Sequence, residues 1–204
     1  MTADQTIPQR YACLLCGLLL AGNAAAEVEV YGIDKTHSFA NWSIRHVVAK
    51  TSGTFSDVRG KIVIDRADLG KSSVEARINV RSLNSNHALR DRNILDKAEY
   101  LDAPRFGEMR FVSSRVEALA ADSGLLHGKL TLHGVTRDIV IPFRLLGFGP
   151  DPWGGQRMGA EAQLTLKAGD YGFGWVKPGA PVGDEIEVTL LIEGVKNSPD
   201  FKPW

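Results

Sequence analysis

The chain has 204 residues, and its 24 Lys and Arg side chains balance its 24 Asp and Glu side chains, so its formal net charge is zero. A neutral chain lacks the broad basic surface on which general binding to nucleic acids or to anionic membranes depends, and this argues against both classes of function. With 44% hydrophobic and 24% charged residues, the composition is that of a globular domain rather than of a disordered chain.

Residues 1–26 differ from the rest of the chain and predict a cleaved secretory signal peptide. Arg10 precedes an uncharged, mostly apolar stretch at 11–22, and small residues follow at 24–26. This order is typical of an export signal, and the stretch is shorter than the ~20 residues that a membrane-spanning helix needs. Both cysteines of the chain, Cys13 and Cys16, lie within it. We therefore expect an exported mature protein without disulfide bonds.

The remaining sequence alternates apolar and polar residues with a period of two, which predicts antiparallel strands with one buried face. Turn residues such as His133-Gly134 separate the runs. The predicted strands are residues 28–34, 41–46, 53–65, 73–81, 108–117, 126–132, 138–145, 160–167 and 185–193. Residues 86–97 break this pattern and predict one short helix with Ser85 as its N-cap.

About eight strands in one domain predict an all-β fold, either a sandwich or a closed antiparallel barrel, and the barrel is favoured because closure removes exposed sheet edges. We expect the barrel to span residues 27–196 and residues 197–204 to form a loose C-terminal tail. Alternation alone does not separate a filled barrel from a hollow one that holds a small ligand.

Motifs that carry catalysis or metal binding are scarce. The five histidines form no H-x-x-x-H pair, so we expect no zinc site, and Gly172-Phe173-Gly174 is too short for a dinucleotide motif. His46 shares a strand face with Trp42 and Ile44, so its imidazole needs a polar partner if that face points inward. We therefore expect an apolar interior with few polar groups, which suits a carrier of an apolar ligand better than an enzyme.

Several motifs, in order, resemble the YceI-like, polyisoprenoid-binding family of exported bacterial proteins. They span about residues 29–195 and are Tyr31–Ser38, Ser43–His46, Gly53–Phe55, Gly60, Arg90-Asp91, Glu99–Pro104, Gly128–Thr136, Asp151–Gly154, Asp170–Gly172 and Val182–Asp184. One departure from the family pattern is Ala160, which follows Gly159 where an aromatic residue is usual. A smaller side chain there is expected to widen an interior cavity.

The resemblance implies a lipocalin-like barrel with an apolar tunnel for an isoprenoid chain, a periplasmic location, no catalysis and no cofactor. Its implied partner is a long-chain isoprenoid lipid, quinone-like or a prenyl phosphate, with no nucleic acid and no stable membrane insertion, and a homodimer is compatible with it. The expected lining is Trp42, Ile44, His46, Val74, Ile78, Leu130, Ile141, Phe143, Leu164, Val188 and Leu190. The candidate head-group contacts are His46, His37, Arg90 and Asp91.

Two other classes of function stay open at this stage. One is an enzyme acting on a lipid with His37 or His46 as its base. The other is a filled barrel that serves as an interaction module in an envelope stress response.

Overall fold

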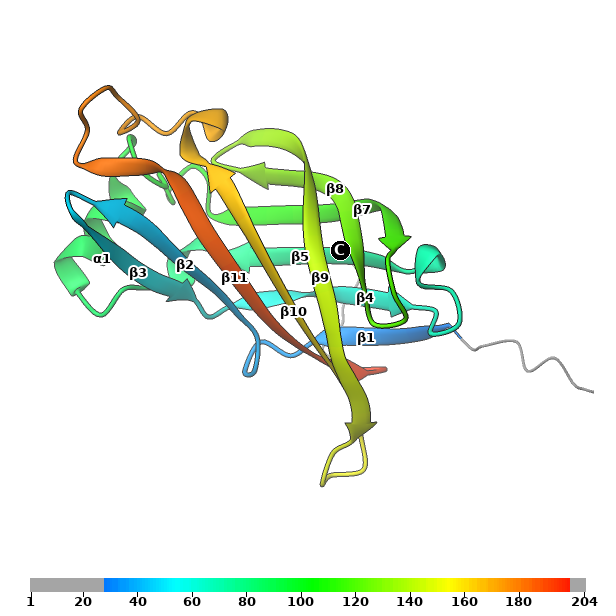
Figure 1. The fold of residues 1–204 in the computed structure, drawn as a ribbon. Helices are drawn as coiled ribbons and strands as arrows, with labels where there is room; N and C mark the ends of the chain where they lie inside the picture. The colour runs from blue at the N-terminus through cyan, green and yellow to red at the C-terminus, as the bar shows by residue number, and fades with distance from the viewer. Residues whose placement is uncertain (1–27, 199–204) are drawn as a thin grey trace, which may run out of the picture.

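A computed structural model describes residues 28–198 (Figure 1). The predicted signal peptide and residues 199–204 of the predicted tail lie outside the described residues. The strands are β1 (Glu29–Ile33), β2 (Phe39–His46), β3 (Ala49–Phe55), β4 (Val58–Ile64), β5 (Ser73–Asn79), β6 (Leu83–Asn84), β7 (Glu108–Ala118), β8 (Ser123–Leu132), β9 (Val135–Pro150), β10 (Gln156–Lys167) and β11 (Val182–Lys196). The helices are α1 (Ala88–Asp96) and the 3₁₀ turns η1 (Leu69–Lys71), η2 (Val80–Ser82) and η3 (Ala168–Tyr171).

Eight of the strands close into an antiparallel barrel, which confirms the predicted fold class. The ring runs β1-β4-β5-β7-β8-β9-β10-β11, and β11 pairs with β1 to close it. Each strand alternates inward apolar and outward polar side chains, so the ring encloses an apolar interior.

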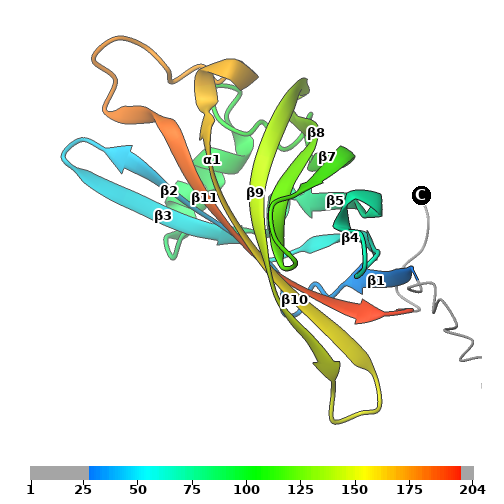
Figure 2. The same ribbon diagram turned by 45° about the vertical axis from the view of Figure 1, so that its right-hand side comes forward.

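The barrel splays at one end, where β2, β3 and β6 continue the sheet beyond the ring (Figures 1 and 2). The last residues of β11 pair with β1, whereas its first residues pair with β2. The sequence predicted one strand over 53–65, but Ser56-Asp57 interrupts it and divides it into β3 and β4. This interruption lets β3 turn away from the ring while β4 stays in it.

Residues 28–198 contain one α-helix, which was predicted at its place but with the wrong N-cap. The cap is His87, whose Nδ1 accepts from the backbone N–H of Arg90 at 3.1 Å. Ser85 is instead buried, and its hydroxyl hydrogen-bonds Asp91 and Arg90. Asn86 has a φ of 60°, so the chain reverses between Ser85 and the helix. No helix within residues 28–198 has the length and apolar character that crossing a membrane requires.

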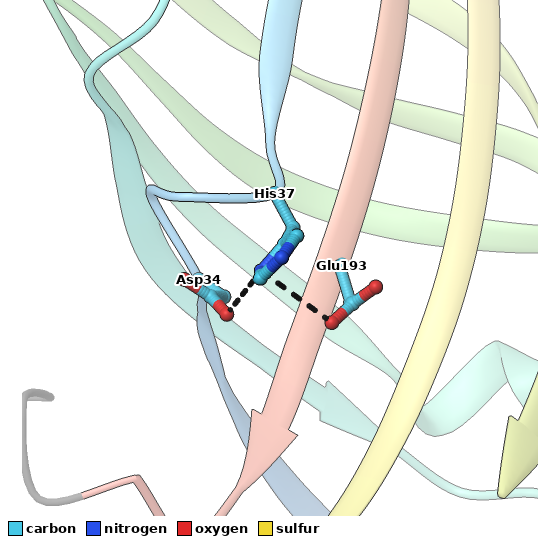
Figure 3. Close-up of side chains that lie close together, drawn as sticks. All are labelled: Asp34, His37 and Glu193. Carbon is cyan, nitrogen blue, oxygen red and sulfur yellow. Dashed lines mark hydrogen bonds and ion pairs between the residues drawn. The ribbon is translucent and has the colours of Figure 1, made fainter. Parts of the chain in front are cut away.

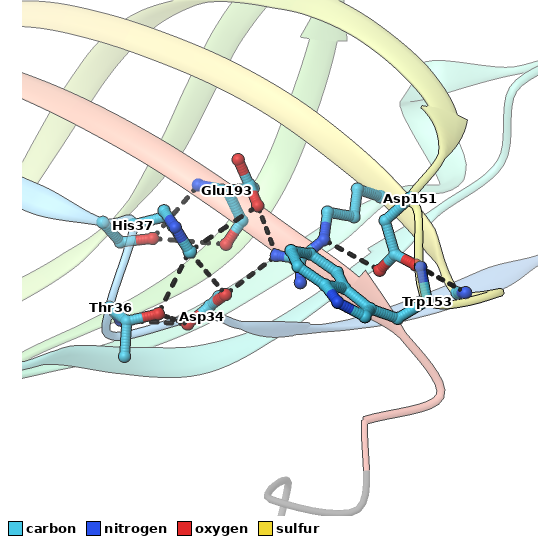
Figure 4. Close-up of polar contacts among 9 residues, drawn as sticks. Asp34, Thr36, His37, Asp151, Trp153 and Glu193 are labelled. Atoms are coloured by element: carbon cyan, nitrogen blue, oxygen red, sulfur yellow. Dashed lines mark hydrogen bonds and ion pairs between the residues drawn. The ribbon is translucent and has the colours of Figure 1, made fainter.

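A polar cluster fixes the corner between β1 and β2. His37 Nδ1 lies 2.9 Å from Asp34 Oδ2 and 3.9 Å from Glu193 Oε1 of β11 (Figure 3). Asp34 also accepts from the backbone N–H and hydroxyl of Thr36 (Figure 4). Arg157 of β10 donates to Asp34 at 2.8 Å, and it also contacts Glu193. The cluster therefore ties the corner to both β10 and β11.

Burial raises the pKa of Asp34, but hydrogen bonds from Thr36, His37 and Arg157 outweigh it and hold this pKa well below its usual range. A carboxyl with a lowered folded-state pKa stabilises the fold above its ordinary pKa of 3.8, and this contribution is lost as the pH falls through the folded-state value.

We expect Asp34→Asn to lower the free energy of unfolding near neutral pH by about 1–3 kcal/mol, because it weakens several partly buried, charge-assisted hydrogen bonds. The difference from the wild type should narrow on acidification below pH 3.8, because the carboxyl of the unfolded wild type binds a proton there, while that of the folded protein does so only at lower pH. Urea unfolding at a series of pH values measures this. Asp138→Asn is the matched control, because Asp138 forms an exposed surface pair with Lys129 and should change little. A difference in unfolding free energy between Asp34→Asn and the wild type that does not change with pH would contradict the lowered pKa of Asp34.

Candidate functional site: an apolar cavity open at one end

The barrel encloses a cavity of about 560 Å³, a size within the range of small-molecule binding sites. At the end away from α1, Tyr31, Leu69, Val116 and Met158 are at most 6% exposed and pack in one buried cluster. They close that end of the interior. The cavity therefore has the form of a pocket with one blind end.

All eleven residues expected to form the lining do line this cavity: Trp42, Ile44, His46, Val74, Ile78, Leu130, Ile141, Phe143, Leu164, Val188 and Leu190. Several of them, such as Val74, Leu130 and Leu164, point inward but are only partly buried, because they border empty space rather than packed neighbours. Ala160 also lines it, at a bulge of the β9–β10 pairing. Whether these side chains contact a ligand stays a prediction.

The opening lies between α1 and the end of β2. Four of the described lining residues at this end are also solvent-exposed: His46, His87, Leu89 and Lys97. Polar lining residues at the mouth include His46, His87, Arg90 and Lys97, while the lining deeper in the barrel is mostly apolar. Such a distribution suits an amphiphilic molecule whose polar end stays near solvent.

The candidate head-group residues are divided between two places. Arg90 lines the mouth, and its Nε donates to the Ser85 hydroxyl at 2.7 Å. Asp91 does not line the cavity; its carboxylate accepts from the backbone N–H of Ser85 at 3.0 Å. His37 also lies outside the lining, in the corner cluster with Asp34. Since β2 separates His37 from His46 by roughly 30 Å, these two histidines do not share a site.

The sequence analysis missed an aromatic wall beside the mouth. Tyr100 stacks on Trp175 with ring centroids 5.4 Å apart, and Trp175 stacks on Phe173 at 4.5 Å. All three line the cavity, and the Trp175 indole donates to the carbonyl of Gly183 at 3.0 Å. The alternating aromatic residues of 171–175 were a usable signal, but they stood out only as a short glycine motif.

Trp42 lies flat against the β2–β3 wall because its partner in the register is Gly53. A Cβ at position 53 would lie 2.6 Å from Trp42 Cζ2 and 2.7 Å from the carbonyl oxygen of Asn84, so the glycine makes room for the indole. The indole N–H of Trp42 is buried and has no hydrogen-bond partner within residues 28–198. A buried donor without a partner costs about 1–3 kcal/mol, which a ligand oxygen within reach would recover.

Asp34, His37 and Glu193 are the described group whose arrangement most resembles a metal site, with ligand atoms within 4.8 Å of one another (Figure 3). Arg157 pairs with both carboxylates of this group. These contacts raise the pKa of Arg157, since the Asp34 hydrogen bond favours its charged form and outweighs burial. The guanidinium therefore supplies the positive charge that a cation would supply, and the group acts as a structural clamp.

A consistent set of relatives emerges from comparison with known proteins. A model of the YceI-like domain matches residues 31–194. The UPF0312 protein of Ectopseudomonas mendocina (strain ymp) is 37% identical over 188 residues, which cover 91% of this chain and 96% of that protein. Burkholderia cenocepacia BcnA has a similar structure, with a TM-score of 0.71 and 18% identity, covering 79% of this chain and 98% of that chain. A polyisoprenoid binding domain from Saccharophagus degradans has a TM-score of 0.60 and 17% identity, covering 81% of this chain and 98% of that chain.

We expect Gly53→Ala to destabilise the protein by about 1–3 kcal/mol, because the added Cβ overpacks against Trp42 and Asn84. The displaced indole should also reduce the binding of an apolar fluorescent dye to the cavity. Urea unfolding and dye titration measure the two effects. Gly149→Ala is the matched control, since it places the same methyl group on a strand with nothing within 4 Å. Equal stability and equal dye affinity of the two variants would show that the position of the indole does not depend on Gly53.

Proposed function

Since the chain belongs to the YceI-like domain family, as its motifs predicted, we propose that it binds and carries a polyisoprenoid or similar long-chain amphiphilic lipid inside its barrel. The observation that supports this most strongly is the 560 Å³ cavity, whose lining is mostly apolar and whose mouth carries polar residues. A solved structural neighbour from Saccharophagus degradans is a polyisoprenoid binding domain, and the fold it shares with this chain accommodates such a cavity.

The cost of an unfilled interior favours a guest. Because the mouth opens to solvent, the apolar walls of an unfilled cavity face water, and an apolar guest removes that surface from water at about 25 cal/mol per Å². A barrel that served stability alone would fill this space with larger side chains. Each CH₂ group of a guest chain buried there contributes about 0.8 kcal/mol, so a long prenyl chain binds tightly with few polar contacts.

We propose that the polar end of the lipid lies at the mouth, next to His46 and Arg90. A quinone-like ring or a prenyl phosphate supplies oxygen acceptors for Arg90 and for the unpartnered indole N–H of Trp42. His37 and Asp91 lie outside the cavity lining and have no part in this arrangement.

Binding rather than catalysis accounts for these features. A lipid-acting enzyme with His37 as its base is disfavoured, because His37 lies outside the cavity lining. His46 does line the mouth, but no hydrogen bond among the described residues orients its imidazole as a base. A ligand-free interaction module is disfavoured by the cavity itself. We further propose that the signal peptide at 1–26 directs the protein to the periplasm, where a carrier moves a lipid through an aqueous space.

Leu164→Trp is expected to weaken the binding of geranylgeraniol at least tenfold, because the larger side chain fills the cavity that Leu164 lines. Displacement of an apolar dye by the prenol measures the affinity, and circular dichroism checks the fold. The matched control is Thr165→Trp, the exposed neighbour on the same strand, which should bind as the wild type does. Unchanged affinity in a folded Leu164→Trp protein would exclude the cavity as the binding site.

A further inference from the structure

The turn between β2 and β3 places two valines where the fold gains little from them. Val47 and Val48 form the two-residue connection and are 52% and 97% exposed. Val47 has a φ of 54°, in the left-handed region that a β-branched residue adopts only under strain. Glycine, asparagine and aspartate are the usual residues at such positions. Exposed, strained apolar side chains therefore point to a role outside folding.

The turn is held rigidly rather than left free. Arg45 donates to the carbonyl oxygens of Val47, Ala180 and Pro181, at 3.1, 3.3 and 3.4 Å. The backbone N–H of Val47 also donates to the carbonyl of Pro181 at 2.6 Å. These contacts join the turn to the loop at 177–182, so the two segments present one surface.

This surface borders the mouth of the cavity. His46, next to the turn, and Val182, at the end of the loop, both line the cavity. Leu89 of α1 lines it too and is 59% exposed, and Figure 1 places α1 at the same end of the barrel as the turn. We call segments 45–50, 87–97 and 177–182 together the mouth rim.

The charge of the mouth rim sets it apart from the neutral chain as a whole. Its three segments hold six Lys or Arg side chains against two carboxylates. Lys50 pairs with Glu187 of β11, whereas Arg45 donates to neutral carbonyls. Exposed apolar side chains surrounded by basic ones match the interface of an anionic phospholipid membrane, which offers acyl chains beneath negative head groups.

We propose that the mouth rim docks on the surface of an anionic phospholipid membrane, with Val47 and Val48 entering the head-group region, so that the cavity opens toward the bilayer. This inference rests on the proposed lipid function for its purpose, but docking is measured separately from ligand binding. Contact of this kind lets a lipid pass between bilayer and cavity without exposing its chain to water.

The test is sedimentation of the protein with vesicles of phosphatidylethanolamine and phosphatidylglycerol, compared with vesicles of phosphatidylcholine. The wild type should bind the anionic vesicles preferentially, and binding should weaken as salt screens the basic rim. The double variant Val47→Gly and Val48→Asn should bind at least tenfold less. It should also be at least as stable as the wild type, because Gly relieves the strain at the positive φ.

The matched control is Trp153→Ser, which removes an exposed apolar side chain (80% exposed) from the β9–β10 turn at the opposite end of the barrel. Register along β11 places His46 beside Val182 and Arg157 beside Val195, so the two turns lie about 40 Å apart. Trp153→Ser should bind vesicles as the wild type does. Three results would each overturn the docking proposal: no vesicle binding by the wild type, undiminished binding by the double variant, or loss of binding in Trp153→Ser.

Dye displacement by geranylgeraniol in detergent solution separates the two proposals. Neither valine lines the cavity, so the double variant should keep the prenol affinity of the wild type while losing its vesicle binding. A parallel loss of both would show that the turn acts through the cavity and would overturn docking as a separate role. Absence of prenol binding in the wild type would instead reject the proposed function.

Discussion

The backbone pairing of β11 with three strands is the constraint on which the rest of the molecule depends. Along one side eleven of its fifteen residues, Glu185–Val195, pair with β10, and along the other side β11 pairs first with β2 and then with β1. The β1 pairing closes the ring, and the β2 pairing carries the sheet outward at the other end. A single strand thereby produces both a blind end and an open mouth, and the corner between β1 and β2 is the point at which these two roles meet.

That corner explains the density of polar contacts outside the cavity. Asp34 lies in the corner, Arg157 in β10 and Glu193 in β11. Arg157 forms ion pairs with both carboxylates. The lowered pKa of Asp34 reflects these contacts, with its hydrogen bonds outweighing burial. The motif that contains Asp34 and His37 therefore shapes the barrel, and the polar residues that line the cavity mouth, such as His46 and Arg90, lie elsewhere.

The sequence predicted the barrel and its lining well because a strand exposes alternate residues to opposite sides. Once Trp42 and Ile44 are placed inside, the period fixes every other residue of the same strand, and the same holds for Leu164 on β10. What could not be predicted depends on contacts between distant segments. The N-cap at His87 follows from the burial of Ser85, and the aromatic wall follows from the approach of Trp175 to Tyr100. The break between β3 and β4 could likewise not be predicted, because it accompanies the splay of the sheet.

The central claim is that the interior is reserved for a prenyl lipid, and native mass spectrometry of the protein purified from its own cells under mild conditions tests it most directly. A lipid carrier should show a discrete added mass that fragmentation identifies as a prenyl lipid and that is lost when the protein is unfolded. Protein that is bare in every preparation, and that takes up no added prenol, would contradict it.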